Sequence, residues 1–230
     1  MYDRKTILLD LYNRLYKALG PRHWWPGDSG FEVAVGAILT QNTAWGNVTK
    51  AIRNLKDKGL LSPEALYHIP VEGLASVIRP AGYYNIKARR LKHFVRFLVQ
   101  ESAGDLDHLL AEDLDTLRSR LLSINGIGPE TADSILLYAG NRPTFVVDAY
   151  TRRILFRHNI IPEEASYDEV RDFFMDCLEP DVSMFNEYHA LLVFLGHTFC
   201  SKRNPKCTEC PARGWNDEEL GGFAPILVLE

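Results

Sequence analysis

Apolar residues recur at steps of three and four along almost the whole chain. Such steps place apolar side chains on one face of a helix, whereas the alternating pattern of a half-buried strand is scarce here. The clearest runs lie at residues 7–19, 31–39, 48–55, 91–98, 114–122 and 135–139. Later helices are predicted around residues 149–156, 167–177 and 185–199. The pattern therefore predicts an all-α protein.

Length and charge narrow the class of protein further. A chain of 230 residues with 46% hydrophobic residues can bury a core of one large or two small domains. No apolar run approaches the roughly 18 residues of a membrane helix, and the first residues lack the apolar stretch of a secretion signal. We therefore expect a cytoplasmic protein without a membrane partner. The net charge of −4 argues against a protein that coats nucleic acid indiscriminately.

Basic residues are nevertheless clustered. One group lies at residues 87–96, a second includes Arg152, Arg153 and Arg157, and a third lies at residues 202–213. Any one of these clusters taken alone is more often a solvated helix face. Together they are compatible with a positive face on an acidic protein.

A tight turn precedes one of the predicted helices. In Gly126-Ile127-Gly128-Pro129 the two glycines permit a sharp turn, and Pro129 suits the first helical turn because its missing N–H is not needed there. Free amides of such a turn can bind a phosphate at the helix N-terminus. Most Gly-x-Gly turns are plain helix connectors. Here, however, Asp148 follows about twenty residues later, between apolar residues and two arginines.

This order of hairpin and carboxylate resembles the helix-hairpin-helix and Gly/Pro-Asp region of the endonuclease III superfamily of DNA base-excision glycosylases. The resemblance runs from Phe31 to about Cys210. It implies two helical lobes that hold double-stranded DNA in a cleft between them. One lobe would span residues 30–140, and the other would combine residues 1–29 with residues 141–230. Gly126, Ile127, Gly128, Lys87, Arg152 and Arg153 are then the expected DNA contacts, made by a monomer.

A second motif contributes to the resemblance. The segment Thr40-Gln41-Asn42-Thr43 looks like the family segment in which a glutamine enters the duplex and fills the gap left by an extruded base. Chemistry on a stacked base requires that extrusion, and an amide can hydrogen-bond to the orphaned partner base. Gln41 and Asn42 are therefore expected to contact DNA. Read without its neighbours, Gln41 is more simply a cap or a surface amide.

Aromatic residues suggest which base is removed. Trp24, Trp25 and Pro26 are adjacent, and Trp45 follows the glutamine segment, although Trp45 is equally suited to a helical core. Aromatic faces attract an electron-poor ring, and a cationic 3-methylpurine most of all. Together with Arg79-Pro80-Ala81-Gly82-Tyr83 and the hairpin, these residues are similar to the bacterial 3-methyladenine DNA glycosylase branch of the superfamily.

Glu130 bears on the mechanism. In the superfamily members that also cut the backbone, a lysine stands two residues after the second hairpin glycine and attacks the sugar. A carboxylate cannot form a Schiff base, so the resemblance implies a monofunctional enzyme that attacks with water, with Glu130 bordering the base pocket. Asp148 would stabilise the oxocarbenium-like sugar or orient the water. Asp148 is also a good N-cap for the helix that follows, and both roles can hold together.

The cysteines leave the metal content open. Cys200, Cys207 and Cys210 match the spacing of the first three ligands of the endonuclease III iron–sulfur loop, but Asn216 occupies the position of the fourth cysteine. A four-iron cluster usually requires four thiolates, and Cys177 is the remaining one. His197 with the three cysteines has the ligand types of a zinc site, and a loop without metal is a third option. The resemblance favours an iron–sulfur (4Fe-4S) cluster.

Other functions remain compatible with the sequence. A glycosylase for mismatched thymine or adenine shares the hairpin and the aspartate, and a glycosylase for oxidised pyrimidines is disfavoured by Glu130. A noncatalytic DNA-binding module is the alternative from another class. It predicts that Asp148 can be lost without consequence.

Overall fold

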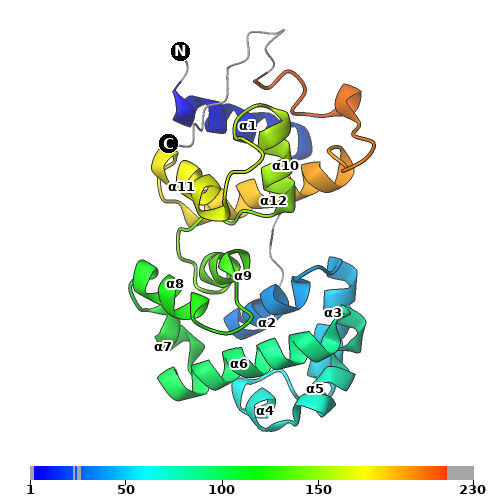
Figure 1. The fold of residues 1–230 in the computed structure, drawn as a ribbon, viewed down its shortest axis with the longest axis vertical. Coiled ribbons are helices and arrows are strands. Elements are labelled where there is room, and N and C mark those ends of the chain that lie inside the picture. Colours follow the sequence, from blue (N-terminus) through cyan, green and yellow to red (C-terminus); the bar gives the residue numbers. More distant parts are fainter. Residues whose placement is uncertain (1–2, 23, 25–26, 217–230) are drawn as a thin grey trace. The chain divides into compact units, whose positions relative to one another are not determined.

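The computed structural model describes residues 3–22, 24 and 27–216, and helices connected by loops make up the described part (Figure 1). No strand occurs among these residues, which confirms the all-α prediction. The helices up to the hairpin are α1 (Arg4–Leu19), α2 (Gly30–Thr40), α3 (Trp45–Asp57), α4 (Pro63–His68), α5 (Val71–Val77), η1 (Arg79–Ala81), α6 (Tyr84–Ser102), α7 (Leu106–Leu110) and α8 (Leu114–Leu122). Those after it are α9 (Pro129–Ser134), η2 (Ile135–Ala139), α10 (Ala149–Arg157), α11 (Tyr167–Cys177), α12 (Val182–Thr198) and η3 (Cys207–Glu209).

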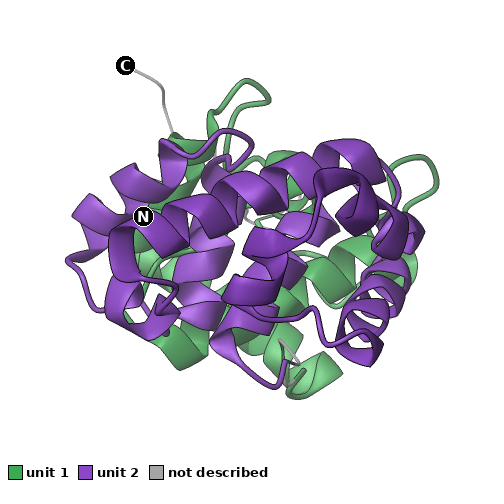
Figure 2. Ribbon diagram, turned by 90° about the horizontal axis from the view of Figure 1, so that it is seen from below, with its two compact units in different colours: residues 1–24, 143–230 green, residues 25–142 purple. Residues whose placement is uncertain are grey.

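The chain forms two compact units (Figure 2). Unit 1 joins residues 1–24 to residues 143–230, and unit 2 is the continuous segment 25–142. None of the described helices is long and apolar enough to cross a membrane.

Unit 2 is organised around α2. Every residue from Phe31 to Leu39 is buried, because α3, α6, α9 and η2 pack around this helix. A helix that is apolar on all sides is expected only in such a central position. Ser29 begins α2 by accepting a hydrogen bond from the Glu32 amide (3.2 Å). The last turn of this buried helix leads directly into Gln41.

One local feature differs from the expected α-helix near residues 135–139. This segment is a π-helix, η2, directly after α9. The wider turn closes with the Gly140 amide donating to the Ile135 carbonyl (3.0 Å) and the Arg142 amide donating to the Leu136 carbonyl (2.9 Å). A π-helix inserts an extra residue into the helical ladder, which the periodicity of a fully apolar run does not reveal.

Unit 1 has an aromatic core. Phe145 stacks on Phe174 of α11 with ring centroids 3.7 Å apart, and Phe185 and Tyr188 of α12 meet the Phe145 ring edge-on. Phe145 thus meets Phe174 face to face and the other two rings edge-on, and the edge-on geometry is one that aromatic pairs prefer. The core fixes the segment that leads into Asp148, because Phe145 lies three residues before it.

Helices α10 and α12 approach closely at Gly196. A Cβ at this position would lie 2.5 Å from the Tyr150 ring, so only glycine allows Tyr150 to pack there. Tyr150 is the second residue of α10, next to the start of the helix at Asp148. The glycine therefore sets how closely α12 passes the candidate catalytic residue.

Candidate functional site

The predicted hairpin joins α8 to α9 in unit 2. Its turn is closed by the Ile127 amide, which donates to the Ile124 carbonyl (3.0 Å). The side chains of Ile124 and Ile127 are buried in the unit 2 core. The structure thus anchors the hairpin by its isoleucines, and any part that Ile127 plays in DNA binding falls to its backbone.

The two hairpin glycines are required for different reasons. Gly126 has φ +96°, and a Cβ there would lie 2.3 Å from Cγ of Arg90. Gly128 has φ −97°, which any residue adopts, and a Cβ there would meet nothing within 4 Å. The fold of this chain therefore explains Gly126 but gives no packing reason for Gly128. An open position at the first turn of α9 is what close approach of a phosphate requires.

Gln41 lies against this hairpin. Its Nε2 donates to the Gly126 carbonyl (3.2 Å) and to Oγ1 of Thr131 (2.8 Å). Its Oε1 accepts a hydrogen bond from Nη1 of Arg90. The structure thus unites the glutamine segment and the hairpin, two motifs 85 residues apart in the sequence. Asn42, the next residue, has a positive φ of 54° and forms the turn beyond Gln41.

Lys87 does not lie where a DNA contact was expected. Its side chain is 1% exposed, and its ammonium donates to the carbonyls of Leu39 and Ala81 (both 2.8 Å) and to the Thr43 hydroxyl. Burial, with a smaller contribution from Arg90, lowers the pKa of Lys87 to about 8. A buried amine with three internal acceptors cannot reach a phosphate. Lys87 instead joins the glutamine segment to the turn before α6.

Asp148 begins α10 in unit 1. Its Oδ1 accepts hydrogen bonds from the Thr151 amide (2.7 Å) and the Thr151 hydroxyl (2.9 Å), so the N-cap role is present. Oδ2 lies 3.7 Å from Nε2 of His189 on α12. The Asp148 side chain is 12% exposed, which leaves it partly accessible.

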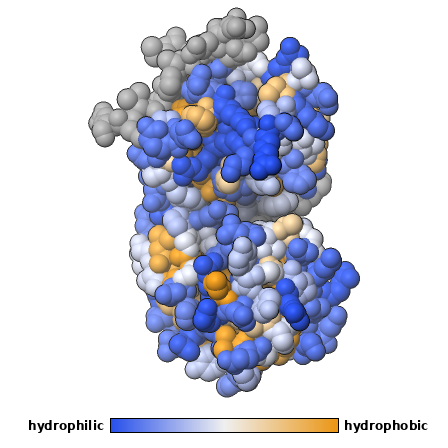
Figure 3. Space-filling model, turned by 45° about the vertical axis from the view of Figure 1, so that its right-hand side comes forward, coloured by the Kyte–Doolittle hydropathy of each residue, from blue (hydrophilic) through white to orange (hydrophobic). Residues whose placement is uncertain are grey.

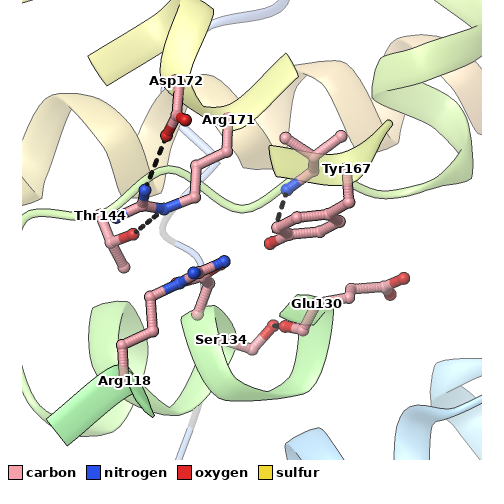
Figure 4. Close-up of polar contacts among 9 residues, drawn as sticks. Arg118, Glu130, Ser134, Thr144, Tyr167, Arg171 and Asp172 are labelled. Atoms are coloured by element: carbon pink, nitrogen blue, oxygen red, sulfur yellow. Dashed lines mark hydrogen bonds and ion pairs between the residues drawn. The ribbon is translucent and has the colours of Figure 1, made fainter. Parts of the chain in front are cut away.

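Helix α11 holds the extended segment that leads to Asp148 (Figure 4). Nε of Arg171 donates to the Thr144 hydroxyl (3.0 Å), and Nη1 of Arg171 pairs with Asp172 (2.9 Å). The Val147 amide donates to the Tyr167 hydroxyl (3.4 Å). These contacts fix the backbone immediately before the carboxylate.

Glu130 is the second residue of α9 and is exposed. The Ser134 hydroxyl donates to its carbonyl (2.7 Å), while the side chain extends away from Ser134 (Figure 4). The residue at the lysine position of the bifunctional enzymes is therefore an accessible carboxylate on the first turn after the hairpin.

The predicted base-pocket residues are only partly described. Trp25 and Pro26 lie outside the described residues, and Trp24 is half-buried in unit 1. Trp45 begins α3 in unit 2 and packs against its hydrophobic core. The aromatic wall for the base stays a prediction.

The two α10 arginines differ in their surroundings. Arg152 is half-buried and makes one long contact, from Nη2 to the Glu163 carbonyl (3.3 Å). Arg153 donates from Nε to the Cys200 carbonyl (2.8 Å) and from Nη2 to the Gly196 carbonyl (3.0 Å). Arg153 thus secures the start of the cysteine loop, residues 200–216, and its donors are largely used within unit 1.

Hydrogen bonds from α10 and the residue after it hold both ends of the cysteine loop. Arg157 donates to the carbonyls of Ser201 (2.8 Å) and Lys202 (2.9 Å) and to the sulfur of Cys200 (3.3 Å). At the other end, Nδ2 of Asn216 donates to the His158 carbonyl (2.6 Å). Asn216 has φ +49°, a left-handed conformation that asparagine tolerates better than most residues.

The ligand set of the loop does not fit a four-thiolate cluster. Cys200, Cys207 and Cys210 lie near enough that the first two raise the pKa of Cys210, although burial is the larger cause. Cys177 lies at the end of α11 within reach of the charge of Arg4 on α1, and His197 is exposed on α12. Across residues 3–22, 24 and 27–216, no three His, Cys, Asp or Glu side chains are arranged to hold a metal ion. The expected fourth ligand is replaced by a hydrogen-bonding amide.

Two residues near Gln41 had only a weak signal in the sequence, since Arg90 lies in a basic cluster and Tyr83 ends the Arg79–Tyr83 segment. Arg90 contacts Gln41 and packs on Gly126, and its signal was only membership of a basic cluster. Tyr83 is 68% exposed with φ +45° in the turn before α6, next to the Ala81 carbonyl that accepts from Thr43 (2.6 Å). Few large hydrophobic side chains of the described residues are exposed, and Tyr83 is the most exposed of those beside the glutamine segment.

On the face drawn in Figure 3, hydrophobic residues form small separate areas among hydrophilic ones.

Comparison with known proteins identifies the family. Residues 35–180 match the model of the HhH-GPD superfamily base excision DNA repair proteins. The chain belongs to this superfamily. The matched residues include Gln41, the hairpin and Asp148, whereas Trp24 and the cysteine loop lie outside them. The HhH-GPD chain is accordingly a DNA glycosylase of base-excision repair and acts on DNA.

Individual relatives agree with this membership. The HhH-GPD chain is 47% identical to a protein of Methanocaldococcus jannaschii named "Putative DNA repair glycosylase", over 93% of this chain and 94% of that protein. It is 30% identical to the endonuclease III of Sulfolobus acidocaldarius, over 80% of each.

Two solved structures share the fold. A non-covalent complex of endonuclease III with DNA has a TM-score of 0.78 at 23% identity, covering 92% of this chain and 94% of that chain. The Helicobacter pylori 3-methyladenine DNA glycosylase bound to 1,N6-ethenoadenine has a TM-score of 0.71 at 29% identity, covering 85% of this chain and 98% of that chain.

The contrast between the glycines gives a paired prediction. Gly126→Ala should destabilise the protein by about 1–3 kcal/mol, because it imposes a strained φ and a clash with Arg90. Gly128→Ala should change the free energy of unfolding by less than about 0.5 kcal/mol. It should still weaken duplex DNA binding about fivefold, as expected for the loss of roughly 1 kcal/mol of contact. Urea unfolding and a DNA-binding titration measure the two effects, and unchanged DNA binding by Gly128→Ala would contradict a phosphate site here.

The cysteine loop gives a metal prediction. Asn216→Cys restores the fourth thiol of the family spacing, so its iron content after anaerobic purification should rise to that of a four-iron cluster, with the corresponding absorbance band. Asn216→Ser is the matched control, because it also removes the amide but adds no thiol. Wild-type protein with a full complement of iron would show that the loop finds a fourth ligand elsewhere.

Proposed function

We propose that this HhH-GPD chain is a monofunctional DNA glycosylase that hydrolyses the N-glycosidic bond of an alkylated purine such as 3-methyladenine. The observation that carries the monofunctional assignment is Glu130, which stands on the first turn of α9 where the bifunctional enzymes have a lysine. Without an amine at this position the sugar is attacked by water, and the product is an intact abasic strand.

Lys87 is not a replacement nucleophile. Its lowered pKa is a property that nucleophilic lysines share, but its ammonium is enclosed by acceptors of unit 2 and 1% exposed. A lysine that attacks a sugar must present its nitrogen to the substrate. The burial of Lys87 therefore supports hydrolysis over lyase chemistry.

Asp148 is the proposed catalytic residue. One of its oxygens is used to cap α10, and the side chain remains partly accessible. The leaving of a base produces an oxocarbenium-like sugar, which a nearby carboxylate stabilises electrostatically, and the same carboxylate can orient the attacking water. A cationic 3-methylpurine already leaves easily, so one carboxylate suffices.

The choice of an alkylated purine has two supports. Two adjacent tryptophans, Trp24 and Trp25, precede Pro26 in the sequence, and electron-poor rings bind well to aromatic faces. In addition, 29% identity links this chain to a 3-methyladenine DNA glycosylase over 98% of that enzyme. The mismatch and oxidised-pyrimidine alternatives differ in the base released.

The unit 2 residues would prepare the duplex. The hairpin at Gly126–Gly128 is the proposed phosphate contact, and Gln41 is the proposed residue that fills the gap left by the flipped base. Because Gln41 is hydrogen-bonded to the hairpin and to Arg90, it must exchange these contacts for the orphaned base. Tyr83, which is 68% exposed, lies beside this segment.

The central prediction concerns Asp148→Asn. Asparagine caps a helix as well as aspartate does, so the variant should fold with nearly unchanged stability. Removal of the charge should slow base release about a hundredfold or more, while duplex binding stays close to that of the wild type. Single-turnover excision and a DNA-binding titration measure the two quantities. Normal turnover by the Asn variant would exclude the proposed chemistry and favour a binding role for the family site.

The substrate is tested with a panel of duplexes that carry methylated, deaminated, oxidised or mismatched bases. We expect release of 3-methyladenine to exceed release of mismatched thymine or uracil, and borohydride to trap no protein–DNA adduct. Robust mismatch excision without release of the methylated purine would reject the alkylation substrate. Efficient trapping would reject the monofunctional mechanism, whatever the base.

A further inference from the structure

His189 is a buried titratable residue that the proposed reaction does not yet use. It lies in the middle of α12 and is 5% exposed. Its Nε2 is 3.7 Å from Oδ2 of Asp148, at the start of α10. Both residues belong to unit 1, and α10 and α12 pack directly against each other.

The two oxygens of Asp148 have different neighbours. Oδ1 accepts from the Thr151 amide and hydroxyl, which fixes one side of the carboxylate. Oδ2 is the oxygen that faces His189. The imidazole therefore lies on the side of the carboxylate that the cap does not use.

The backbone maintains this arrangement from both sides. Gly196, seven residues after His189 on α12, admits the ring of Tyr150 from α10, with a Cβ contact that only glycine avoids. Arg153 joins α10 to the Gly196 carbonyl (3.0 Å). The distance between the start of α10 and the middle of α12 is thus set by packing on both helices.

We propose that His189 is a positioning residue that orients the Asp148 carboxylate toward the sugar without neutralising it. This inference rests on the proposed catalytic role of Asp148. A separation of 3.7 Å is longer than a hydrogen bond, so the ring borders the carboxylate without donating a hydrogen bond to it. A permanently charged partner at this place would compensate the negative charge that stabilises the developing sugar cation.

The surroundings of His189 favour an uncharged imidazole. Burial lowers the pKa of His189, and the opposing effect of Asp148 is the smaller of the two. A lowered pKa favours the neutral imidazole, which adds no positive charge beside the Asp148 carboxylate. The position of His189 thus orients the Asp148 carboxylate, and burial disfavours the charged imidazole that an ion pair with Asp148 would require.

The test compares two substitutions with a matched control. His189→Gln retains a polar N–H-bearing group of similar reach, whereas His189→Leu retains bulk alone. Tyr188→Phe is the control, because Tyr188 is buried on the same helix but donates its hydroxyl to the Leu8 carbonyl of α1 (2.8 Å). The substrate is the lesion that the wild type excises fastest, and a duplex with a tetrahydrofuran abasic analogue measures binding.

We expect His189→Leu to lower the single-turnover excision rate by about ten- to a hundredfold, since a small displacement of a catalytic group has effects of this size. Its dissociation constant for the abasic duplex should stay within about twofold of the wild-type value. His189→Gln should recover most of the rate. Tyr188→Phe should lower stability in urea while leaving the rate unchanged.

The outcomes separate this inference from the proposed function. If the wild type excises a base and Asp148→Asn does not, but His189→Leu retains the full rate, the positioning role is wrong and the role of Asp148 stands. Equal losses of excision rate in His189→Gln, His189→Leu and Tyr188→Phe would show that His189 contributes only to core packing. If the wild type releases no base from any duplex, the proposed function fails, and this inference fails with it.

Discussion

The Asp148 carboxylate carries a constraint on which the arrangement of unit 1 depends. The same side chain begins α10 and, in its proposed catalytic role, must remain partly accessible. Its Oδ1 is committed to Thr151, so the orientation of Oδ2 follows from where the helix starts. The start of the helix is in turn held by the extended segment before it, which α11 secures through Arg171 and Tyr167. A capping interaction thereby orients the carboxylate that is proposed to be catalytic.

In unit 2, several contacts depend in a comparable way on Gly126. The absence of a side chain there allows Arg90 to pack on the hairpin, and Arg90 and the Gly126 carbonyl then both bind Gln41. Lys87 holds the other side of the same segment through the Leu39 carbonyl and the Thr43 hydroxyl. The candidate gap-filling residue is therefore held by the half-buried Arg90, and its segment by the buried Lys87, whose cost of burial is offset by two carbonyl acceptors and a hydroxyl. Gly128 is the exception, because no atom of the described residues would lie within 4 Å of a Cβ at this position.

The sequence predicted the helical class because a period of three to four is visible wherever one helix face is buried. It also predicted the hairpin and the capping aspartate, whose residue types follow from local backbone demands. It could not separate a buried cation from an exposed one. Lys87 and Arg153 are residue types that commonly contact phosphates. In the structure, however, Lys87 is buried in unit 2, and Arg153 donates to a carbonyl of the cysteine loop. His189 gave no signal, because its neighbour in space is 41 residues away in the chain.

The cysteine loop illustrates how one residue changes what a motif can do. Three cysteines keep the spacing of a cluster loop, but Asn216 offers an amide, and amides are poor ligands for iron in sulfur clusters. The loop does not lack restraints, since Arg153 and Arg157 bind its first carbonyls and the Trp215 ring is buried with its indole N–H donating to the Ile7 carbonyl (3.1 Å). A four-iron cluster fixes such a loop because its irons are bound by four thiolates of the chain. Here, hydrogen bonds from Arg153, Arg157 and Asn216 hold the two ends of the loop within unit 1.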